Sequence, residues 1–452
     1  MARIFPFQAY RYNPARVKLE DVVTQPYDKI SPAMQDRYYA TSPYNLISVE
    51  KGKTRPDDSA TNNVYTRAAR TLEEWIASGV LLREPVASLY VYIQKYKAPG
   101  ESTERTRKGL IAIGQVEDYS AGVIFRHEQT LSGPKADRLE LLRRTKTHTG
   151  QLFMLYTDPA RRVDAQLDKI SQAPPTAEAR DDLEVLHQLW AITDPALIQS
   201  ITGELADKKL AIADGHHRYE TALAYLDECR AKSGSPVRAE RVASKDRSAP
   251  YERVMMTLFN TAGEGLIVLP THRVVSRVAD FSFERFRDRV KDEFDCRSYS
   301  FSAGPARTAA FSMFLSHLEQ SDAERPSIGA FAGGDAFHLF TLRADANLNA
   351  LLPDVSVMQR RLDVVLLHKL LIERGLGITA EAVKGERNLT YERDMEAAID
   401  AVDRGEAQLC FLLNAISAEQ TAQIAFAGEV LPQKSTDFYP KLLSGLTLYR
   451  LE

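Results

Sequence analysis

Hydrophobic and polar positions follow two different periods along the chain, which predicts a mixture of strands and helices. Residues 89–96, Leu-Tyr-Val-Tyr-Ile-Gln-Lys-Tyr, alternate with a period of two and have the composition of a strand. A turn at Ala98-Pro-Gly-Glu and a second apolar run over 110–117 complete a predicted hairpin. Over 63–78, apolar residues recur at spacings of three and four and end before Gly79, which predicts a helix with a C-terminal glycine.

The remaining pattern predicts an α+β (mixed α/β) fold. Five prolines among the first 45 residues favour extended segments and turns over a long helix. Helical spacing returns over 358–374, 393–404 and 418–427, and the last of these begins with the capping-box pattern Ser417-Ala-Glu-Gln. Residues 408–413 have the composition of a buried strand. The polar run 231–250 is expected to be a mobile segment or a lid.

Composition narrows the class of protein. The 58 Lys and Arg against 61 Asp and Glu give a net charge of −3, which argues against a basic nucleic-acid-binding protein. Three separate cysteines without a CxxC pair argue against a disulfide framework and favour a reducing cytoplasm. The strongest apolar stretch, 364–372, contains His368 and Lys369 and is far shorter than a membrane span. Its apolar neighbours predict that His368 lies in a core or an interface.

The strongest chemical signal is Leu210-Ala-Ile-Ala-Asp-Gly-His-His-Arg-Tyr, which predicts a strand, a tight turn at Asp214-Gly215 and a helix from His216. Such a junction presents free backbone N–H groups and the positive end of the helix dipole, a geometry that binds phosphate. Gly215 lets the backbone approach a ligand closely, and Arg218 offers two donors to phosphate oxygens. His216 and His217 are about 100° apart on a helix, so one of them is expected to face a second group or the core. Alternatively, Asp214 is a simple helix N-cap.

The motif Asp214-Gly-His-His-Arg resembles the signature of the ParB/sulfiredoxin-like superfamily, and it is most similar to the free-serine kinase branch. More of the chain resembles a large bacterial family of the unknown-function type, often labelled ParB-like; this family has Pro where the chain has Gln25. The matching pieces are Gln25-Pro-Tyr-Asp-Lys-Ile-Ser, Arg126-His-Glu-Gln-Thr, Pro134-Lys-Ala-Asp-Arg, Leu269-Pro-Thr-His-Arg-Val-Val and Leu431-Pro-Gln-Lys-Ser-Thr-Asp-Phe-Tyr-Pro-Lys. The resemblance implies a nucleotide-binding core over 1–300 and an additional α/β part over 301–452.

Further polar segments supply candidate site residues. Between Arg126 and Arg138, Glu128 or Asp137 could bind Mg²⁺ or act as a base, and Lys135 and Arg138 could neutralise phosphate; His127 belongs to the same segment. A solvated loop is the alternative. Asp28 is either a local cap or, by resemblance, a substrate-binding or catalytic carboxylate. Two further groups are candidates for anion binding, or else belong to surface loops: His272 with Arg273, and Lys434, Ser435 and Thr436.

Together these features predict a phosphotransferase that uses ATP or ADP to phosphorylate a small hydroxyl substrate, with free L-serine as a candidate. Gly215, His216, His217 and Arg218 would hold the nucleotide, and Asp214 and Glu128 are the candidate Mg²⁺ ligands. Asp28, Glu128, Asp214 and His217 are the candidate catalytic groups. A ParB-like DNA-binding or regulatory protein is the alternative, although no helix–turn–helix with a basic recognition helix is evident. A non-catalytic scaffold with a retained pocket is a third possibility. A homodimer is compatible with the sequence, which does not fix the oligomeric state.

Overall fold

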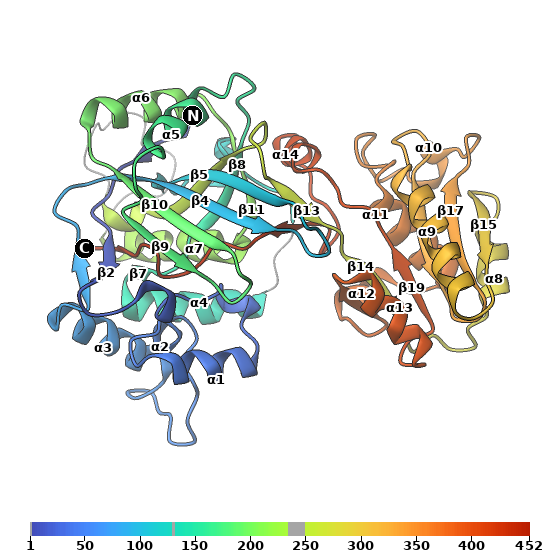
Figure 1. Ribbon diagram of the computed structural model, residues 1–452, viewed down its shortest axis with the longest axis horizontal. Coiled ribbons are helices and arrows are strands. Elements are labelled where there is room, and N and C mark those ends of the chain that lie inside the picture. Colours follow the sequence, from blue (N-terminus) through green and yellow to red (C-terminus); the bar gives the residue numbers. More distant parts are fainter. Residues whose placement is uncertain (1, 129–131, 234–248) are drawn as a thin grey trace. The chain divides into compact units, whose positions relative to one another are not determined.

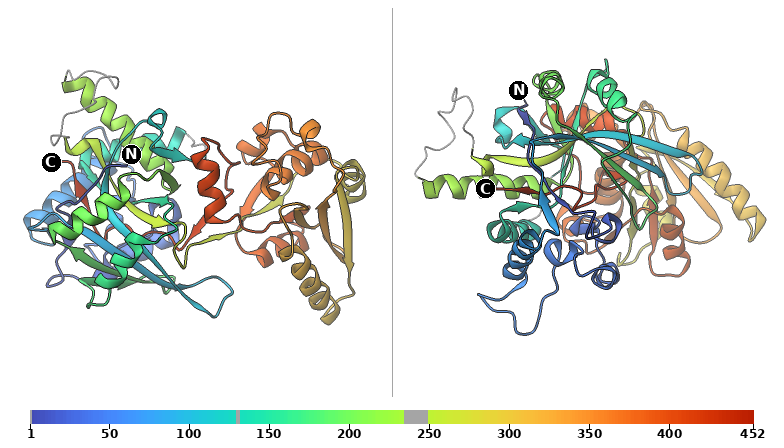
Figure 2. Two further views of the ribbon diagram at one scale, coloured as in Figure 1. Left: turned by 90° about the horizontal axis from the view of Figure 1, so that it is seen from above. Right: turned by 60° about the vertical axis from the view of Figure 1, so that its left-hand side comes forward.

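Two units make up the structure, and the chain passes between them several times. The computed structural model describes residues 2–128, 132–233 and 249–452 (Figure 1). Unit 1 contains Met1–Leu266, Ala425–Gly428 and Phe438–Glu452, and unit 2 contains Ile267–Ile424 and Glu429–Asp437. Both chain ends therefore lie in unit 1 (Figures 1 and 2). Most of the predicted lid, residues 234–248, lies outside the described residues.

The division differs from the expected boundary at residue 300. The segment after Leu266 belongs to unit 2 because its strand β14 (His272–Val275) pairs with two strands that come more than a hundred residues later, β18 (Leu389–Glu392) and β19 (Leu409–Leu412). The last fifteen residues return to unit 1, where β21 (Tyr449–Arg450) pairs with β7 (Thr147–His148). Backbone pairing over long sequence separations sets this division.

Unit 1 is built on a nine-stranded mixed sheet. Its hydrogen-bonded order is β6-β11-β8-β12-β5-β4-β10-β9, with β1 added beside β5. The predicted hairpin is confirmed, since β4 and β5 pair antiparallel along their length. The strands are β1 (Ile4–Phe5), β4 (Leu89–Lys97), β5 (Glu104–Gln115), β6 (Ile124–Arg126), β8 (Leu152–Tyr156), β9 (Ala177–Arg180), β10 (Leu186–Ile192), β11 (Leu210–Asp214) and β12 (Arg253–Asn260).

Helices and short ribbons surround this sheet. Apolar residues of three helices, α5, α6 and α7, pack with one set of alternating strand residues into a single core. The helices are α1 (Pro32–Thr41), α2 (Ile47–Glu50), α3 (Val64–Ala77), α4 (Ser132–Thr145), α5 (Arg162–Ile170), α6 (Pro195–Leu205) and α7 (His216–Ser233). Short elements are β2 (Tyr10–Tyr12), β3 (Leu81–Arg83), η1 (Leu19–Asp21), η2 (Tyr27–Lys29), η3 (Tyr119–Ala121) and η4 (Pro250–Glu252).

Helix α1 corrects the expectation of extended segments and turns, in place of a long helix, near the N-terminus. It is ten residues long and starts at Pro32, with the Ser31 hydroxyl accepting a hydrogen bond from the Met34 amide at 3.2 Å. Proline is tolerated in the first turn because its missing N–H has no partner within the helix there. Proline spacing alone therefore misjudges this segment.

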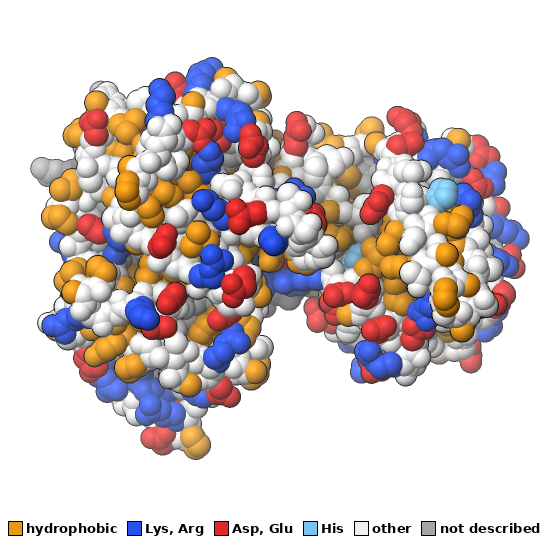
Figure 3. All heavy atoms as spheres, in the orientation of Figure 1, with side chains coloured by type: hydrophobic (Ala, Val, Ile, Leu, Met, Phe, Trp, Pro, Cys, Tyr) orange, Lys and Arg blue, Asp and Glu red, His pale blue; other side chains and the backbone are white. Residues whose placement is uncertain are grey.

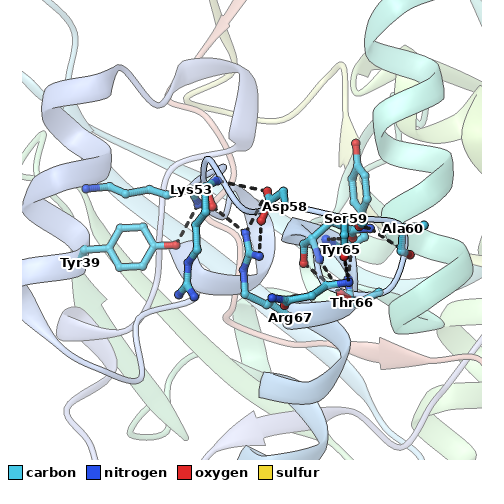
Figure 4. Close-up of polar contacts among 11 residues, drawn as sticks. Tyr39, Lys53, Asp58, Ser59, Ala60, Tyr65, Thr66 and Arg67 are labelled. Carbon is cyan, nitrogen blue, oxygen red and sulfur yellow. Dashed lines mark hydrogen bonds and ion pairs between the residues drawn. The ribbon is translucent and has the colours of Figure 1, made fainter.

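The predicted helix over 63–78 is confirmed as α3, which begins with a reciprocal cap. Asn63 accepts from the Thr66 amide at 3.1 Å, and the Thr66 hydroxyl accepts from the Asn63 amide at 2.9 Å. The preceding loop is closed by Arg67, which binds the Asp58 carboxylate and donates to the Lys53 carbonyl at 2.9 Å (Figure 4). These contacts satisfy the first-turn amides that a helix leaves without internal partners.

Unit 2 has a six-stranded sheet of order β15-β17-β16-β19-β14-β18. The predicted strand over 408–413 is β19, and the predicted helices over 393–404 and 418–427 are α13 (Met395–Asp403) and α14 (Ala418–Phe426). The helix expected over 358–374 starts later, as α11 (Asp363–Leu366), and continues as the π-helix η5 (Leu367–Gly375). The other elements of unit 2 are β13 (Ile267–Leu269), β15 (Phe294–Ser300), β16 (Ser327–Phe331), β17 (Ala336–Leu342), α8 (Phe283–Arg289), α9 (Pro305–Glu319), α10 (Leu348–Leu351) and α12 (Ala380–Lys384). Strand β20 (Asp437–Tyr439) begins at the last residue of unit 2 and continues into unit 1.

Candidate functional site

The predicted strand–turn–helix junction is present in unit 1. Strand β11 ends at Asp214, Gly215 has a φ of +94°, and α7 begins at His216. One Asp214 carboxylate oxygen accepts a hydrogen bond from the Gly215 amide at 3.0 Å. A Cβ at position 215 would lie 3.1 Å from the Leu152 side chain, so both the backbone angle and the space require glycine. The first amides of α7 therefore stand at the end of a central strand.

Replacing Gly215 with alanine is expected to destabilise unit 1 by about 1–3 kcal/mol, because a left-handed backbone and a close contact act together. Urea unfolding followed by tryptophan fluorescence measures this change. Gly203→Ala in α6 is the matched control, since no atom lies within 4 Å of its added Cβ. That control is expected to leave stability unchanged or raise it by up to about 1 kcal/mol. An equal effect of the two substitutions would contradict the prediction.

Positive side chains surround Asp214. Lys441, in the returning C-terminal segment, places its Nζ 3.2 Å from an Asp214 carboxylate oxygen, and only 11% of the Lys441 side chain is exposed. Burial opposes ionisation of Asp214, but the charges of Lys441, Lys29 and Arg218 outweigh it and lower the pKa of this carboxyl. Asp214 is therefore an ionised group held within a cationic environment at the start of a helix.

Arg218 lies across the end of strand β8. Its Nη1 donates to the Gln151 carbonyl at 3.0 Å, and its Nη2 is 3.6 Å from a carboxylate oxygen of Glu50, which is 2% exposed. The buried Glu50 also accepts a hydrogen bond from the Thr149 hydroxyl. Burial disfavours the charged guanidinium, but Glu50, Asp28 and Tyr27 reverse this and raise the pKa of Arg218. The predicted phosphate-binding arginine is thus held at a fixed position.

Tyr27 connects Arg218 to Arg138. The centre of the Tyr27 ring lies 5.5 Å from the guanidinium carbon of Arg218 and 4.3 Å from that of Arg138, so one aromatic ring contacts two cations. Arg138 also donates to the Glu50 carbonyl at 2.8 Å and pairs with Asp137. Burial raises the pKa of Tyr27 to about 12, which keeps its hydroxyl protonated. Asp28 follows Tyr27 in η2 and is exposed.

His216 is the histidine of the pair that faces the interior. Its ring centre lies 4.9 Å from that of His127, and both residues are buried. The Nδ1 of His127 donates to the Ile212 carbonyl at 2.7 Å. Burial lowers the pKa of both imidazoles, so both are neutral at pH 7. Glu128 is half-buried, and its charge partly offsets the effect of burial on His127.

The remaining candidates are distributed between the two units. Lys135 in α4 lies 3.7 Å from the Glu220 carboxylate in α7. His272, Arg273, Lys434, Ser435 and Thr436 belong to unit 2. There, Arg273 is 1% exposed and donates to the carbonyls of Gln433 and Lys434, each at 3.2 Å. It also donates to the imidazole of His368 at 3.3 Å, and His368 is buried, as expected.

Comparison with known proteins gives the family. Residues 4–365 match the model of a family described as "Protein of unknown function (DUF1015)". The chain belongs to the DUF1015 family. This confirms the expected membership of a family of the unknown-function type, whereas the relation to the ParB/sulfiredoxin-like superfamily stays a prediction. None of the curated proteins matches this DUF1015 chain significantly.

Several solved structures show a weak likeness to this DUF1015 member. A conserved hypothetical protein from Pyrococcus furiosus has 13% identity and a TM-score of 0.32, over 72% of this chain and 90% of that chain. A free serine kinase in complex with AMP has 12% identity and a TM-score of 0.33, over 72% and 88%. SbnI from Staphylococcus aureus, with a C-terminal truncation, has 9% identity and a TM-score of 0.33, over 74% and 87%. Scores this low do not establish a function, so the proposal below rests on the residues of this chain.

The described part of this DUF1015 chain contains no group of three or more His, Cys, Asp or Glu side chains placed to hold a metal ion. None of the helices in the described ranges has the length and apolar composition needed to cross a bilayer.

The folded chain adds two lysines to the candidate residues. Lys29 and Lys441 lie in the same family-like segments as Asp28 and as Lys434, Ser435 and Thr436, but no local pattern distinguishes these lysines from the other lysines of the chain. Their proximity to Asp214 depends on how distant segments fold together. Glu50 had no local signal, since it is a single acidic residue at the end of the four-residue helix α2.

Protonation of buried histidines gives a pH prediction that is clearest for His272 in unit 2. Its Nδ1 accepts from the Leu413 amide at 3.2 Å, and burial followed by the charge of Arg273 lowers its pKa to about 4. The unfolded chain takes up a proton near pH 6.5 and the folded chain does not, so stability is complete above pH 6.5 and falls below it. The expected loss from His272 between pH 7.5 and pH 5 is about 2 kcal/mol.

Urea unfolding followed by circular dichroism at both pH values measures this loss. His272→Gln removes one of these titrating groups and is expected to reduce the loss of stability between pH 7.5 and pH 5 by about 2 kcal/mol, whereas the partly exposed His317→Gln in α9 should leave the loss unchanged. An identical pH dependence for wild type and His272→Gln would contradict the assignment.

Proposed function

We propose that this protein is a nucleotide-dependent phosphotransferase that phosphorylates a small hydroxyl-bearing metabolite, with free L-serine as the first substrate to test. The observation that carries the proposal is the ionised Asp214 at the start of the 18-residue helix α7, with Lys441 at 3.2 Å and Lys29 nearby. Helix amides and cations together favour a polyphosphate. Phosphoryl transfer requires mainly positioning and charge neutralisation, which such a site supplies.

In this proposal, the amides of His216 and His217 at the start of α7 bind nucleotide phosphates, and Lys29 and Lys441 neutralise their charge. The acceptor hydroxyl oxygen forms the new P–O bond while the bond to the leaving nucleotide oxygen breaks. The hydroxyl proton passes to Asp28 or Glu128, the candidate bases. A Mg²⁺ ion bound with the nucleotide would add charge neutralisation, and Asp214 and Glu128 are the candidate protein ligands for it.

The test is nucleotide consumption by the purified chain with ATP or ADP, Mg²⁺ and a panel of amino acids and hydroxy acids that includes L-serine. Mass spectrometry of a phosphorylated product is the expected result. Nucleotide binding without product across the panel would refute the transferase and leave a nucleotide-binding protein.

On the face shown in Figure 3, basic and acidic side chains are interspersed, which gives the DNA-binding alternative no added support.

A further inference from the structure

Four side chains beside the start of α7 carry polar atoms that have no hydrogen-bond partner among the described residues. These atoms are Thr24 Oγ1, Gln151 Nε2, Arg218 Nη2 and Ser444 Oγ. Thr24, Gln151 and Ser444 are only 1%, 2% and 1% exposed. Leaving such a buried group without a partner costs about 1–3 kcal/mol, so a cluster of them indicates an acceptor that comes from outside the chain.

Two of these groups are held side by side by the backbone. The Thr24 amide donates to the Ser444 carbonyl at 3.1 Å, and the Ser444 amide donates to the Thr24 carbonyl at 2.9 Å. Residues that exchange both hydrogen bonds in an antiparallel bridge direct their side chains to the same face. The two hydroxyl groups therefore stand on one side of this bridge.

Gly150 lies beside Arg218 and Ser444, and its neighbour Gln151 binds Arg218 through its backbone carbonyl. The position that a Cβ at residue 150 would occupy lies 3.0 Å from both the Arg218 Cζ and the Ser444 Oγ. Gln151 follows directly, with its carbonyl bound to Arg218 and its side-chain oxygen bound to the Thr257 hydroxyl, which leaves the side-chain NH₂ as the donor. The missing side chain at Gly150 thus lets the Arg218 guanidinium and the Ser444 hydroxyl lie close together against this backbone.

The charge of these four groups favours a carboxylate over a polyphosphate as their ligand. Arg218 is partly neutralised by Glu50 at 3.6 Å, and the other three groups are uncharged donors. A polyphosphate is better matched by Lys29 and Lys441 around Asp214, whereas a carboxylate carries one charge and offers two oxygens to a guanidinium and two hydroxyls. Asp28, four residues after Thr24, lies near enough to Arg218 to raise its pKa.

We propose that Thr24, Gln151, Arg218 and Ser444 bind the carboxylate of a small hydroxy acid or hydroxyamino acid. The proposal rests on the proposed function in one respect, since this acid would be the phosphoryl acceptor and Asp28 would stand beside its hydroxyl. The substrate class is thereby narrowed from hydroxyl compounds in general to those with a carboxylate close to the hydroxyl.

The binding test uses the full chain with acetate, glycolate and L-serine as carboxylate probes, ethanolamine as the probe without a carboxylate, and inorganic phosphate. Calorimetry is expected to show binding of the three carboxylates in competition with one another, and ethanolamine at least tenfold weaker than L-serine. Thr24→Val and Ser444→Ala are each expected to weaken L-serine about tenfold to a hundredfold. Ser312→Ala, an exposed hydroxyl on α9, is the matched control and should change nothing.

Stability without ligand provides an independent measurement. Because Thr24→Val removes a hydroxyl that has no partner, the melting temperature of the free protein is expected to stay the same or rise. A fall of several degrees would show that the hydroxyl is already bonded within the chain and would overturn the proposal. Binding of phosphate as tightly as glycolate, or no response to any carboxylate, would overturn it as well.

The outcomes separate this proposal from the proposed function. Carboxylate binding that depends on Thr24 and Ser444, without any phosphorylated product, supports the ligand class and refutes the transferase. Turnover of L-serine with an unchanged KM in Thr24→Val and Ser444→Ala supports the transferase and refutes the carboxylate site. A raised KM for L-serine with an unchanged KM for the nucleotide supports both.

Discussion

Replacing Lys441 with methionine is expected to weaken ADP or ATP binding about a hundredfold, which corresponds to about 2.7 kcal/mol. The substitution keeps the length and apolar stem of the side chain but removes the charge that lies 3.2 Å from Asp214. It also leaves the Asp214 carboxylate ionised at the site where phosphates would bind. The nucleotide would therefore lose the attraction of Lys441 and be repelled by Asp214. Calorimetric titration with ADP and with ATP measures the effect.

Two further variants isolate the cause. Lys209→Met removes an exposed lysine directly before β11, the strand that ends at Asp214, and should leave nucleotide affinity unchanged. The double variant Lys441→Met with Asp214→Asn removes both charges and should recover part of the lost affinity, because the repulsion disappears. Unchanged nucleotide binding by folded Lys441→Met would place the phosphates elsewhere and remove the main support for the proposed site.

Arg107→Leu is expected to destabilise unit 1 by about 3–5 kcal/mol. This arginine is 1% exposed, and it donates to the Tyr439 carbonyl at 2.9 Å, the Pro440 carbonyl at 2.6 Å and the Gln94 side chain. Its guanidinium carbon also lies 4.7 Å and 4.8 Å from the ring centres of two phenylalanines. Burial lowers the pKa of Arg107 to about 10, so it remains charged at neutral pH. Leucine would remove the donor that these three acceptors share.

The two tryptophans of the chain, Trp75 and Trp190, both lie in unit 1, so urea unfolding followed by fluorescence reports on this unit. Arg105→Leu is the matched control on the same strand, since its pairing with Glu101 is at the surface, and its effect is expected to stay within about 0.5 kcal/mol. Limited proteolysis should also cut Arg107→Leu faster near residues 438–445. Equal stability of the two variants would show that the returning segment is held without Arg107.

Features that depend on neighbouring residues were predictable from the sequence. The hairpin β4–β5, the capped helix α3 and the junction between β11 and α7 each follow from a short periodic pattern with a turn or cap at its end. The glycine at position 215, where the backbone is left-handed, is also a local feature. In these cases the free energy is set by local backbone preferences and by which face of an element is apolar, and both are visible in a short window.

The composition of the candidate site depends instead on contacts between distant segments. Thr24, Glu50, Gln151 and Lys441 come from four separate parts of the chain, and their pairing follows from strand order and from the return of the C-terminal segment to unit 1. A hydrophobic pattern predicts that a face is buried, but it does not identify the segment that covers that face. Many different apolar segments could pack against the same face. The motif around Asp214 therefore pointed to a phosphate-binding turn, whereas the cations that surround this turn and the donors beside it emerge when the chain is folded.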